Sequence, residues 1–194
     1  PSLALKLSGL YRVTKQDSKA AGPLVDYLKL QPGDYTLRRD LASLYQTLGD
    51  NDKAIRQYEK LLTVQPKDPM VLNNLAWLYE AKGDPRSVEF AQKAYDLESS
   101  RPEIADTLGW MLLNHNQEPH GLVLLQDAAT HAPGVAEIRY HLAVALNRVG
   151  RKDEARSELE RLLNEQESFP ETKEAKALLA ELKGGLRMLI PIGS

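Results

Sequence analysis

The chain has 194 residues, of which 42% are hydrophobic and 27% charged, and its formal net charge is −2. These values suit a folded domain or a short repeat array, and they provide no overall positive field that would attract nucleic acid or an anionic membrane. The sequence contains no cysteine, which excludes disulfides, zinc–thiolate sites and a cysteine nucleophile. No stretch approaches the roughly 20 apolar residues that span a bilayer. The chain begins with Pro1, so we expect a fragment that omits any targeting segment.

A leucine recurs every 33 or 34 residues along the chain, and the same pattern of residues follows each copy. The five copies are Leu7, Leu41, Leu75, Leu108 and Leu142. A small residue follows each leucine at once, and Tyr or Leu follows four residues after it, which predicts a first helix with one apolar stripe. A turn signal comes next, with Gly in three copies and Asn in one, then a second small residue, and in most copies a closing proline. We expect the turn glycines to adopt positive φ and the small residues to let two helices approach closely.

The repeat predicts five helical hairpins, a capping helix and a tail. The expected hairpins cover about 1–34, 35–68, 69–101, 102–135 and 136–168, the capping helix covers 170–183, and the tail covers 184–194. The third hairpin is one residue short, and we place the deletion near Pro85. In the first hairpin, Gly22-Pro23 either kinks the second helix or begins it. One hairpin cannot bury its own apolar face, so neighbours must stack into a single array over 1–183.

These positions resemble the tetratricopeptide repeat, whose signature has 34 residues and the order Trp, Leu-Gly, Tyr, Ala, aromatic, Pro. In the second hairpin Leu41, Ala42, Tyr45, Gly49 and Pro66 all match. The early tryptophan is missing, and its slot holds Arg38, Leu72, Ala105 and Arg139. The resemblance implies an all-α, right-handed solenoid of helix-turn-helix repeats with a C-terminal capping helix.

A narrower resemblance covers roughly residues 35–183. The phrases NNLAWLY, DTLGWML, EIRYHLAVAL and GRKDEARSELERLL, followed by FPETKEAKALLAEL, are similar to the C-terminal part of the TPR-repeat lipoproteins of bacterial PEP-CTERM/exosortase systems. The resemblance implies a longer, exported and lipid-anchored parent on the periplasmic side, associated with exopolysaccharide production and protein sorting.

The sequence carries no catalytic constellation. We interpret the four histidines, His115, His120, His131 and His141, as solvated or loop residues, because no metal-binding spacing joins them. No phosphate-binding loop is present, and the carboxylates are interleaved with Lys and Arg as on solvated helix surfaces. We therefore expect no enzyme activity, no cofactor and no metal site.

We expect a partner to bind along the first helices, which line the concave surface of such a solenoid. The resemblance implies that positions 2, 5, 9, 12 and 13 of each first helix face this groove. From these positions we select as peptide-binding candidates Arg39, Ser43, Met70, Asn73, Trp77, Asp106, Trp110, Tyr140 and Asn147.

Two alternatives stay open for Trp77 and Trp110. Large aromatic side chains on a groove can anchor a peptide and contribute about 2 kcal/mol each. They can also wedge between adjacent first helices and take over the packing of the missing tryptophan. A carboxylate clamp of the cochaperone type is not expected, because Glu103 stands where a lysine is required and would repel the ligand.

The predicted function is a scaffold or adaptor that binds a peptide or protein on the groove. The alternatives are a structural segment that extends a longer array or self-associates through the apolar tail 186–192, and polysaccharide binding through the aromatic residues. No nucleic-acid partner and no membrane insertion of this fragment are expected.

Overall fold

The computed structural model describes the backbone of residues 1–187 and the side chains of residues 1–184. All the regular secondary structure in this part of the chain is helical, as the sequence predicted. The helices form two compact units, Pro1–Leu97 and Glu98–Ser194, which we call the N-terminal and the C-terminal unit. A single array over 1–183 stays a prediction. The tail 186–192, predicted to self-associate, lies outside the residues whose side chains are described.

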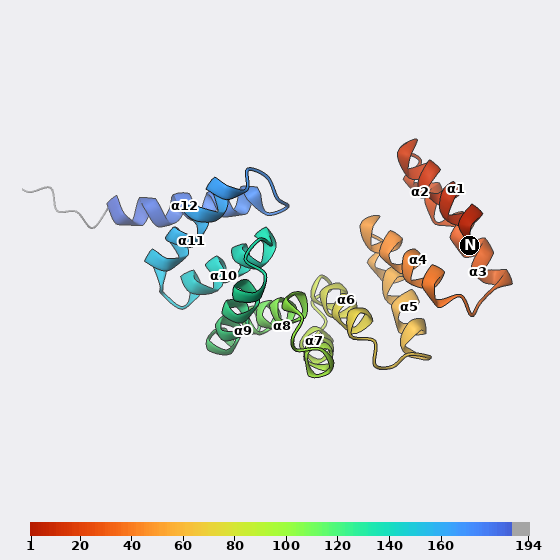
Figure 1. Ribbon diagram of the computed structural model, residues 1–194, viewed down its shortest axis with the longest axis horizontal. Coiled ribbons are helices and arrows are strands. Elements are labelled where there is room, and N and C mark those ends of the chain that lie inside the picture. The colour runs from red at the N-terminus through yellow and green to blue at the C-terminus, as the bar shows by residue number, and fades with distance from the viewer. Residues whose placement is uncertain (188–194) are drawn as a thin grey trace, which may run out of the picture. The chain divides into compact units, whose positions relative to one another are not determined.

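The N-terminal unit consists of helices that pair in chain order (Figure 1). They are α1 (Ser2–Val13), α2 (Asp17–Ala20), α3 (Gly22–Leu30), α4 (Tyr35–Thr47), α5 (Asn51–Leu62), α6 (Pro69–Glu80) and α7 (Arg86–Leu97). Helix α4 packs along α5, and α6 packs along α7, so the second and third predicted hairpins are each a helix pair. Helix α5 then packs against α6, which joins the two hairpins through one apolar core.

The C-terminal unit repeats this arrangement and adds a last helix (Figure 1). Its helices are α8 (Pro102–Asn114), α9 (Glu118–His131), α10 (Ala136–Arg148), α11 (Lys152–Glu165) and α12 (Thr172–Arg187). The hairpins α8–α9 and α10–α11 pack through α9 and α10, and α12 covers α11. Ala175 and Leu182 of α12 are buried in the core of this unit, which is how a capping helix closes an apolar face.

The first hairpin is irregular where the sequence predicted a break. Helix α2 ends at Ala20, and α3 begins at Gly22. Pro23 occupies the first turn of α3, where the missing N–H of proline leaves no hydrogen bond unmade. The second helix of this hairpin therefore consists of two short helices.

The turns inside the hairpins have the backbone conformation that the sequence predicted. Gly49, Gly83 and Gly150 adopt φ values of 74°, 64° and 84°. Asn116 takes the same place in the α8–α9 hairpin with φ 60°, and Lys15 takes it in the first hairpin with φ 56°. Asparagine tolerates this left-handed region better than other side chains, whereas lysine is strained there.

Helix α12 differs from the prediction at its end. The sequence predicted that Gly184-Gly185 would end the capping helix, but α12 continues to Arg187. A glycine inside a helix costs about 1 kcal/mol relative to alanine and does not forbid the conformation. The cost is small enough for the helix to continue through both residues.

Arginines replace the missing tryptophan in two hairpins, and in one of them the guanidinium is buried. The side chain of Arg139 is only 2% exposed. Its Nε donates to Glu158 Oε1 at 2.5 Å, and its Nη1 donates to Glu165 Oε2. Two carboxylates from the next helix therefore hold a positive charge in a place where the repeat signature has an indole.

Candidate functional site

The first helices α1 and α4 enclose a pocket of about 240 Å³ on the face where binding was predicted. Ser43, a predicted binding residue, lines it together with Thr47. Leu5, Gly9 and Arg12 line the opposite side. These three residues stand at positions 5, 9 and 12 of the first hairpin, which are among the positions expected to face the groove. Applying the same repeat register to the first hairpin would therefore have predicted them.

Arg39 and Met70 lie at the connection between the second and third hairpins. The Arg39 guanidinium donates to Asp68 Oδ2 at 2.5 Å. Asp68 is the N-cap of α6, and its other oxygen accepts from the backbone N–H groups of Met70 and Val71 at 3.0 and 3.1 Å. Arg39 is thus held by a residue that itself caps a helix, and Met70 is half-buried beside it.

Asn73 and Trp77 lie one turn apart on α6. Asn73 is only 6% exposed, and within the described part of the chain its Oδ1 accepts no hydrogen bond. A buried amide oxygen without a donor is uncommon in folded proteins and costs free energy. Trp77 is half-buried, so part of its indole is packed and part is exposed.

In the C-terminal unit, three side chains from α8 and α10 form one stack. Both carboxylate oxygens of Asp106 lie 2.9 Å from His141 Nδ1. The Trp110 ring stacks on the imidazole with 4.1 Å between ring centroids and 26° between planes. Asp106 and His141 are buried, while Trp110 is half-buried. Trp110 therefore packs between adjacent first helices, and part of its indole remains exposed.

The interpretation of the histidines is wrong for His141. His115, His120 and His131 are exposed, as expected, but His141 is 3% exposed and lies in the middle of α10. Its partner Asp106 lies one repeat earlier in the sequence, on α8. The sequence contains no local signal for this pair, because it forms only when two first helices lie side by side.

Tyr140 and Glu137 border the stack on α10. Tyr140 is half-buried, with its ring centroid 6.0 Å from that of His141. Burial raises the pKa of the Tyr140 phenol, and Glu174 and Glu171 add to this. Desolvation by the surrounding helices likewise raises the pKa of Glu137, although His141 opposes the shift. The aromatic face of this unit is thus flanked by carboxylates, which favours a positively charged ligand.

The last predicted residue, Asn147, is half-buried on the final turn of α10. Next to it, Arg148 donates to the Leu113 carbonyl oxygen at 2.9 Å and to Asn114 Oδ1 at 3.1 Å. These contacts satisfy the C-terminal end of α8. Binding by Asn147 and the other candidates stays a prediction.

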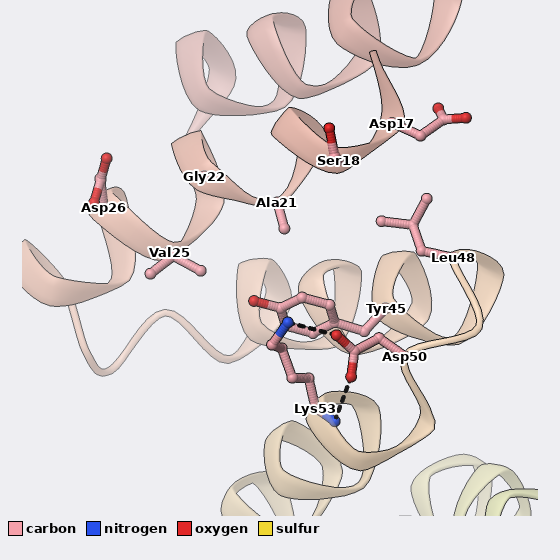
Figure 2. A pocket seen from close by; sticks show the side chains of 10 residues that line it. All are labelled: Asp17, Ser18, Ala21, Gly22, Val25, Asp26, Tyr45, Leu48, Asp50 and Lys53. Atoms are coloured by element: carbon pink, nitrogen blue, oxygen red, sulfur yellow. Dashed lines mark hydrogen bonds and ion pairs between the residues drawn. The ribbon is translucent and has the colours of Figure 1, made fainter. Parts of the chain in front are cut away.

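A second hollow lies away from the predicted residues, between the α2–α3 segment and the α4–α5 hairpin. Figure 2 shows this pocket of about 610 Å³, with Tyr45 and the Asp50–Lys53 pair on one wall. Asp50 caps α5, and its Oδ2 accepts from Lys53 Nζ at 2.5 Å. The Lys53 hydrogen bond lowers the pKa of Asp50. Asp50 thus serves the N-terminus of α5, and Lys53 neutralises its charge.

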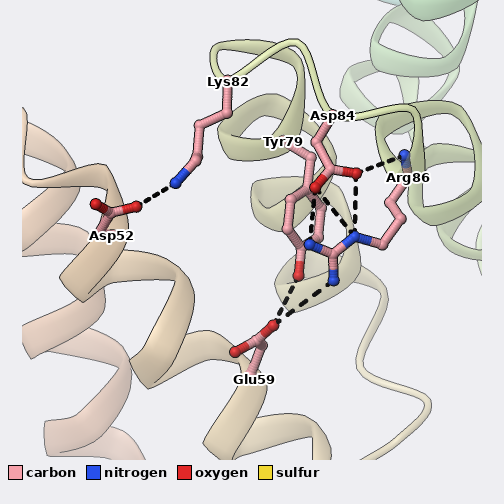
Figure 3. A network of polar contacts seen from close by, with 6 residues as sticks. All are labelled: Asp52, Glu59, Tyr79, Lys82, Asp84 and Arg86. Carbon is pink, nitrogen blue, oxygen red and sulfur yellow. Dashed lines mark hydrogen bonds and ion pairs between the residues drawn. The ribbon is translucent and has the colours of Figure 1, made fainter.

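A polar network joins the second and third hairpins (Figure 3). Tyr79 OH donates to Glu59 Oε1 at 2.8 Å, and the Arg86 guanidinium lies 4.1 Å from the Tyr79 ring centroid. Asp84 accepts hydrogen bonds from Arg86, which lowers the pKa of Asp84 to about 2. Lys82 pairs with Asp52 at the edge of the network. These contacts hold α5 against α6 and α7 and leave the predicted groove residues uninvolved.

Within residues 1–184 no group of three or more His, Asp or Glu side chains is placed to hold a metal ion. None of the described helices is both long and apolar enough to cross a membrane.

Profiles described as tetratricopeptide repeat match residues 36–78 and 121–182. No curated protein matches the sequence. Among solved structures, the chain is similar to PilW, a widely conserved type IV pilus biogenesis factor, with TM-score 0.74, 18% identity and coverage of 100% of this chain and 94% of that chain.

Two further structures are similar to this chain. A thermophilic TPR protein of Thermus thermophilus, TTC0263, aligns with TM-score 0.70 and 18% identity, over 93% of this chain and 97% of that chain. YrrB, described as a TPR protein with an unusual peptide-binding site, aligns with TM-score 0.63 and 17% identity, over 90% of each chain. At these identities the likeness shows the fold alone.

Proposed function

We propose that this chain, which belongs to the tetratricopeptide repeat family, is a protein-binding module that holds a segment of another protein against the first helices of its C-terminal unit. Proteins built from such helical repeats generally bind other proteins on extended surfaces. No residue constellation in the sequence supports catalysis, so we assign the module a scaffold or adaptor role.

The observation that carries the proposal is the partly exposed pair Trp110 and Tyr140. An indole and a phenol that are packed on one side and open on the other present rigid apolar area at low entropic cost. Binding energy in interfaces concentrates on such residues. Trp110 is held in place by His141 and Asp106, so it needs no ordering when a ligand binds.

The charges around this pair specify the kind of segment. Glu137 lies on the same helix as Tyr140. Glu171 acts electrostatically on both side chains, and Glu174 acts on Tyr140. Carboxylates next to an apolar surface complement lysine and arginine side chains. We therefore assign to this face a segment that combines an apolar anchor with at least one basic residue.

The proposal is tested by affinity capture with the purified chain, identification of the bound proteins by mass spectrometry and calorimetry with the partner so identified. Tyr140→Ala and Glu137→Lys are compared with the control Glu181→Lys, which changes the same charge on the exposed side of α12. We expect the first two variants to weaken binding at least about tenfold, or about 1.4 kcal/mol, and the control to bind as the unchanged chain does. Equal binding by all three would exclude this face.

The phrases of residues 73–163 support a setting in an exopolysaccharide or protein-sorting system of bacteria, in a longer exported lipoprotein. Fractionation of the native cells, with an antibody against this chain, tests the setting independently of the binding face. We expect the parent in the membrane fraction and accessible from outside the cytoplasm. A parent confined to the cytoplasm would contradict the setting and leave the binding proposal intact.

A further inference from the structure

The slot of the missing tryptophan opens onto a pocket in both hairpins that carry arginine there. In the N-terminal unit the pocket measures about 260 Å³ and contains Arg38; in the C-terminal unit it measures about 360 Å³ and contains Arg139. The two pockets are lined from the same repeat positions. Arg38, Leu41, Gln57 and Lys60 correspond to Arg139, Leu142, Glu158 and Arg161. Each pocket lies between the second helix of one hairpin and both helices of the next.

The two pockets differ in the groups that accept hydrogen bonds from their arginine, and only one set of acceptors is charged. Arg139 donates to two carboxylates, those of Glu158 and Glu165. Arg38 donates instead to the side-chain oxygen of Gln57 at 3.0 Å and to the backbone oxygen of Pro32 at 2.6 Å. Neutral acceptors fix the direction of a guanidinium and leave its positive charge uncompensated.

Two lysines add to the charge of the Arg38 pocket. Lys29 and Lys60 line it, and no lining residue is acidic. Lys29 Nζ pairs with Asp26 at 2.7 Å, but both side chains are exposed, at 69% and 74%, so solvent screens that pair strongly. With Asp26 included, the four side chains carry two net positive charges.

We infer that the Arg38 pocket binds a dianionic oxyanion of the phosphate type, either free phosphate or a small phosphate monoester. A phosphate group carries between one and a half and two negative charges at neutral pH and offers several strong acceptor oxygens. Arg38 uses only two of the five N–H groups of a guanidinium in its hydrogen bonds to Gln57 and Pro32. The buried side chains Leu28 and Leu41 form an apolar wall, which strengthens charge interactions beside it.

The Arg139 pocket suggests the substitution that tests the Arg38 pocket. Gln57→Glu gives the Arg38 pocket the counterion that Glu158 already provides for Arg139, so the backbone is expected to tolerate it. The introduced carboxylate would neutralise Arg38 and repel an anion. Lys60→Gln removes one cation of the pocket. Arg161→Gln is the matched control, because Arg161 is the counterpart of Lys60 in the neutralised pocket.

The experiment follows backbone amide chemical shifts of the full chain during titration with inorganic phosphate, at constant ionic strength and pH 7.5. We expect saturable shifts around residues 29, 38, 57 and 60. We also expect Gln57→Glu and Lys60→Gln to weaken the affinity at least about tenfold, and Arg161→Gln to leave it unchanged. Absence of saturable binding to the unchanged chain, equal affinity in Gln57→Glu, or an equal loss in Arg161→Gln would each overturn the inference.

A parallel titration with glycerol 3-phosphate distinguishes a site for a phosphate monoester from a site for free phosphate. Tighter binding than that of inorganic phosphate assigns the pocket to a phosphate ester, and equal binding assigns it to the free ion; either result supports the oxyanion site. Circular dichroism of each variant confirms that its helices are intact, so a lost affinity is not mistaken for a lost fold.

Discussion

Gly109 and Gly121 face each other where α8 and α9 cross, so closely that a β-carbon on Gly121 would lie 2.6 Å from the carbonyl oxygen of Gly109. A β-carbon on Gly109 would in turn lie 2.8 Å from Leu125 Cγ. Each glycine thus makes room for the backbone or core of the opposite helix, as the repeat pattern predicted for its two small positions.

Gly121→Ala is therefore expected to destabilise the C-terminal unit, even though alanine is the better helix former. Forcing a methyl group into a packed contact costs about 1–3 kcal/mol. Urea unfolding followed by circular dichroism measures the loss. Gly134→Ala is the control, because a β-carbon there meets no atom within 4 Å. An unchanged midpoint for Gly121→Ala would show that the two helices can move apart freely.

Lys15 occupies the turn position where three other hairpins have glycine, and its φ is 56°. The left-handed conformation costs an ordinary side chain about 1 kcal/mol. Lys15→Gly is expected to stabilise the chain by about that amount, and Gly49→Lys, in the equivalent turn, to destabilise it similarly. Thermal unfolding of both variants tests the pair. A lower melting temperature for Lys15→Gly would contradict the assignment of strain to this residue.

The Tyr79 phenol is expected to be among the last to ionise. Burial and its hydrogen bond to Glu59 raise the pKa of Tyr79 from 10.0 to about 12. Below pH 10 this phenol is protonated in the folded and the unfolded chain alike. Between pH 10 and about 12 the unfolded chain loses the proton first, so the free energy of unfolding should fall as pH rises.

Ultraviolet titration of the tyrosine phenols in the unchanged chain and in Tyr79→Phe tests whether the pKa of Tyr79 is raised. The difference between the two curves should show one group with a midpoint well above 10, provided that the chain remains folded. A difference curve centred near 10 would mean that Tyr79 is not buried against Glu59 in solution.

Asn73→Leu is expected to leave the stability unchanged or to raise it. The substitution removes a buried oxygen that accepts no hydrogen bond within residues 1–184, and an apolar side chain of similar size avoids the cost of that unmade bond, about 1–3 kcal/mol. Chemical denaturation gives the sign. A loss of more than about 1 kcal/mol would show that the Asn73 amide makes a stabilising contact.

Asp106→Ala is expected to destabilise the C-terminal unit by about 2–3 kcal/mol, because it removes the buried carboxylate that contacts His141 Nδ1. Asp106→Asn keeps one carbonyl oxygen for Nδ1 and should cost distinctly less. Urea unfolding of both variants makes the comparison. Equal losses would show that an amide oxygen cannot replace the carboxylate here and that the negative charge of Asp106 carries the contact.

The hairpins, their turns and their close contacts were predictable from the sequence because each depends on local pattern. Positive φ at Gly49, Gly83 and Gly150 follows from the position of a glycine after an apolar stripe. The approach of Gly109 to Gly121 follows from small residues at reciprocal positions of one hairpin. Such features need only the helical period and the repeat register.

The buried polar groups were not predictable in the same way. His141 meets Asp106, and Arg139 meets Glu165, only after helices from different parts of the chain pack together. Arginine is seldom fully buried unless it is paired, and histidine is buried less often than apolar side chains, so neither residue type predicts such burial. The continuation of α12 through Gly184 was missed for another reason: the propensity of glycine to end a helix is a weak preference and yields to context.

The stack of Trp110 on His141 also provides an intrinsic fluorescence probe of the C-terminal unit. The chain contains only two tryptophans, so Trp77→Phe leaves Trp110 as the sole indole emitter. The emission of an indole in ring contact with an imidazole changes when the two first helices separate. The intrinsic fluorescence of that single-tryptophan chain would therefore report, without an attached dye, whether a bound partner separates α8 from α10 or leaves them in contact.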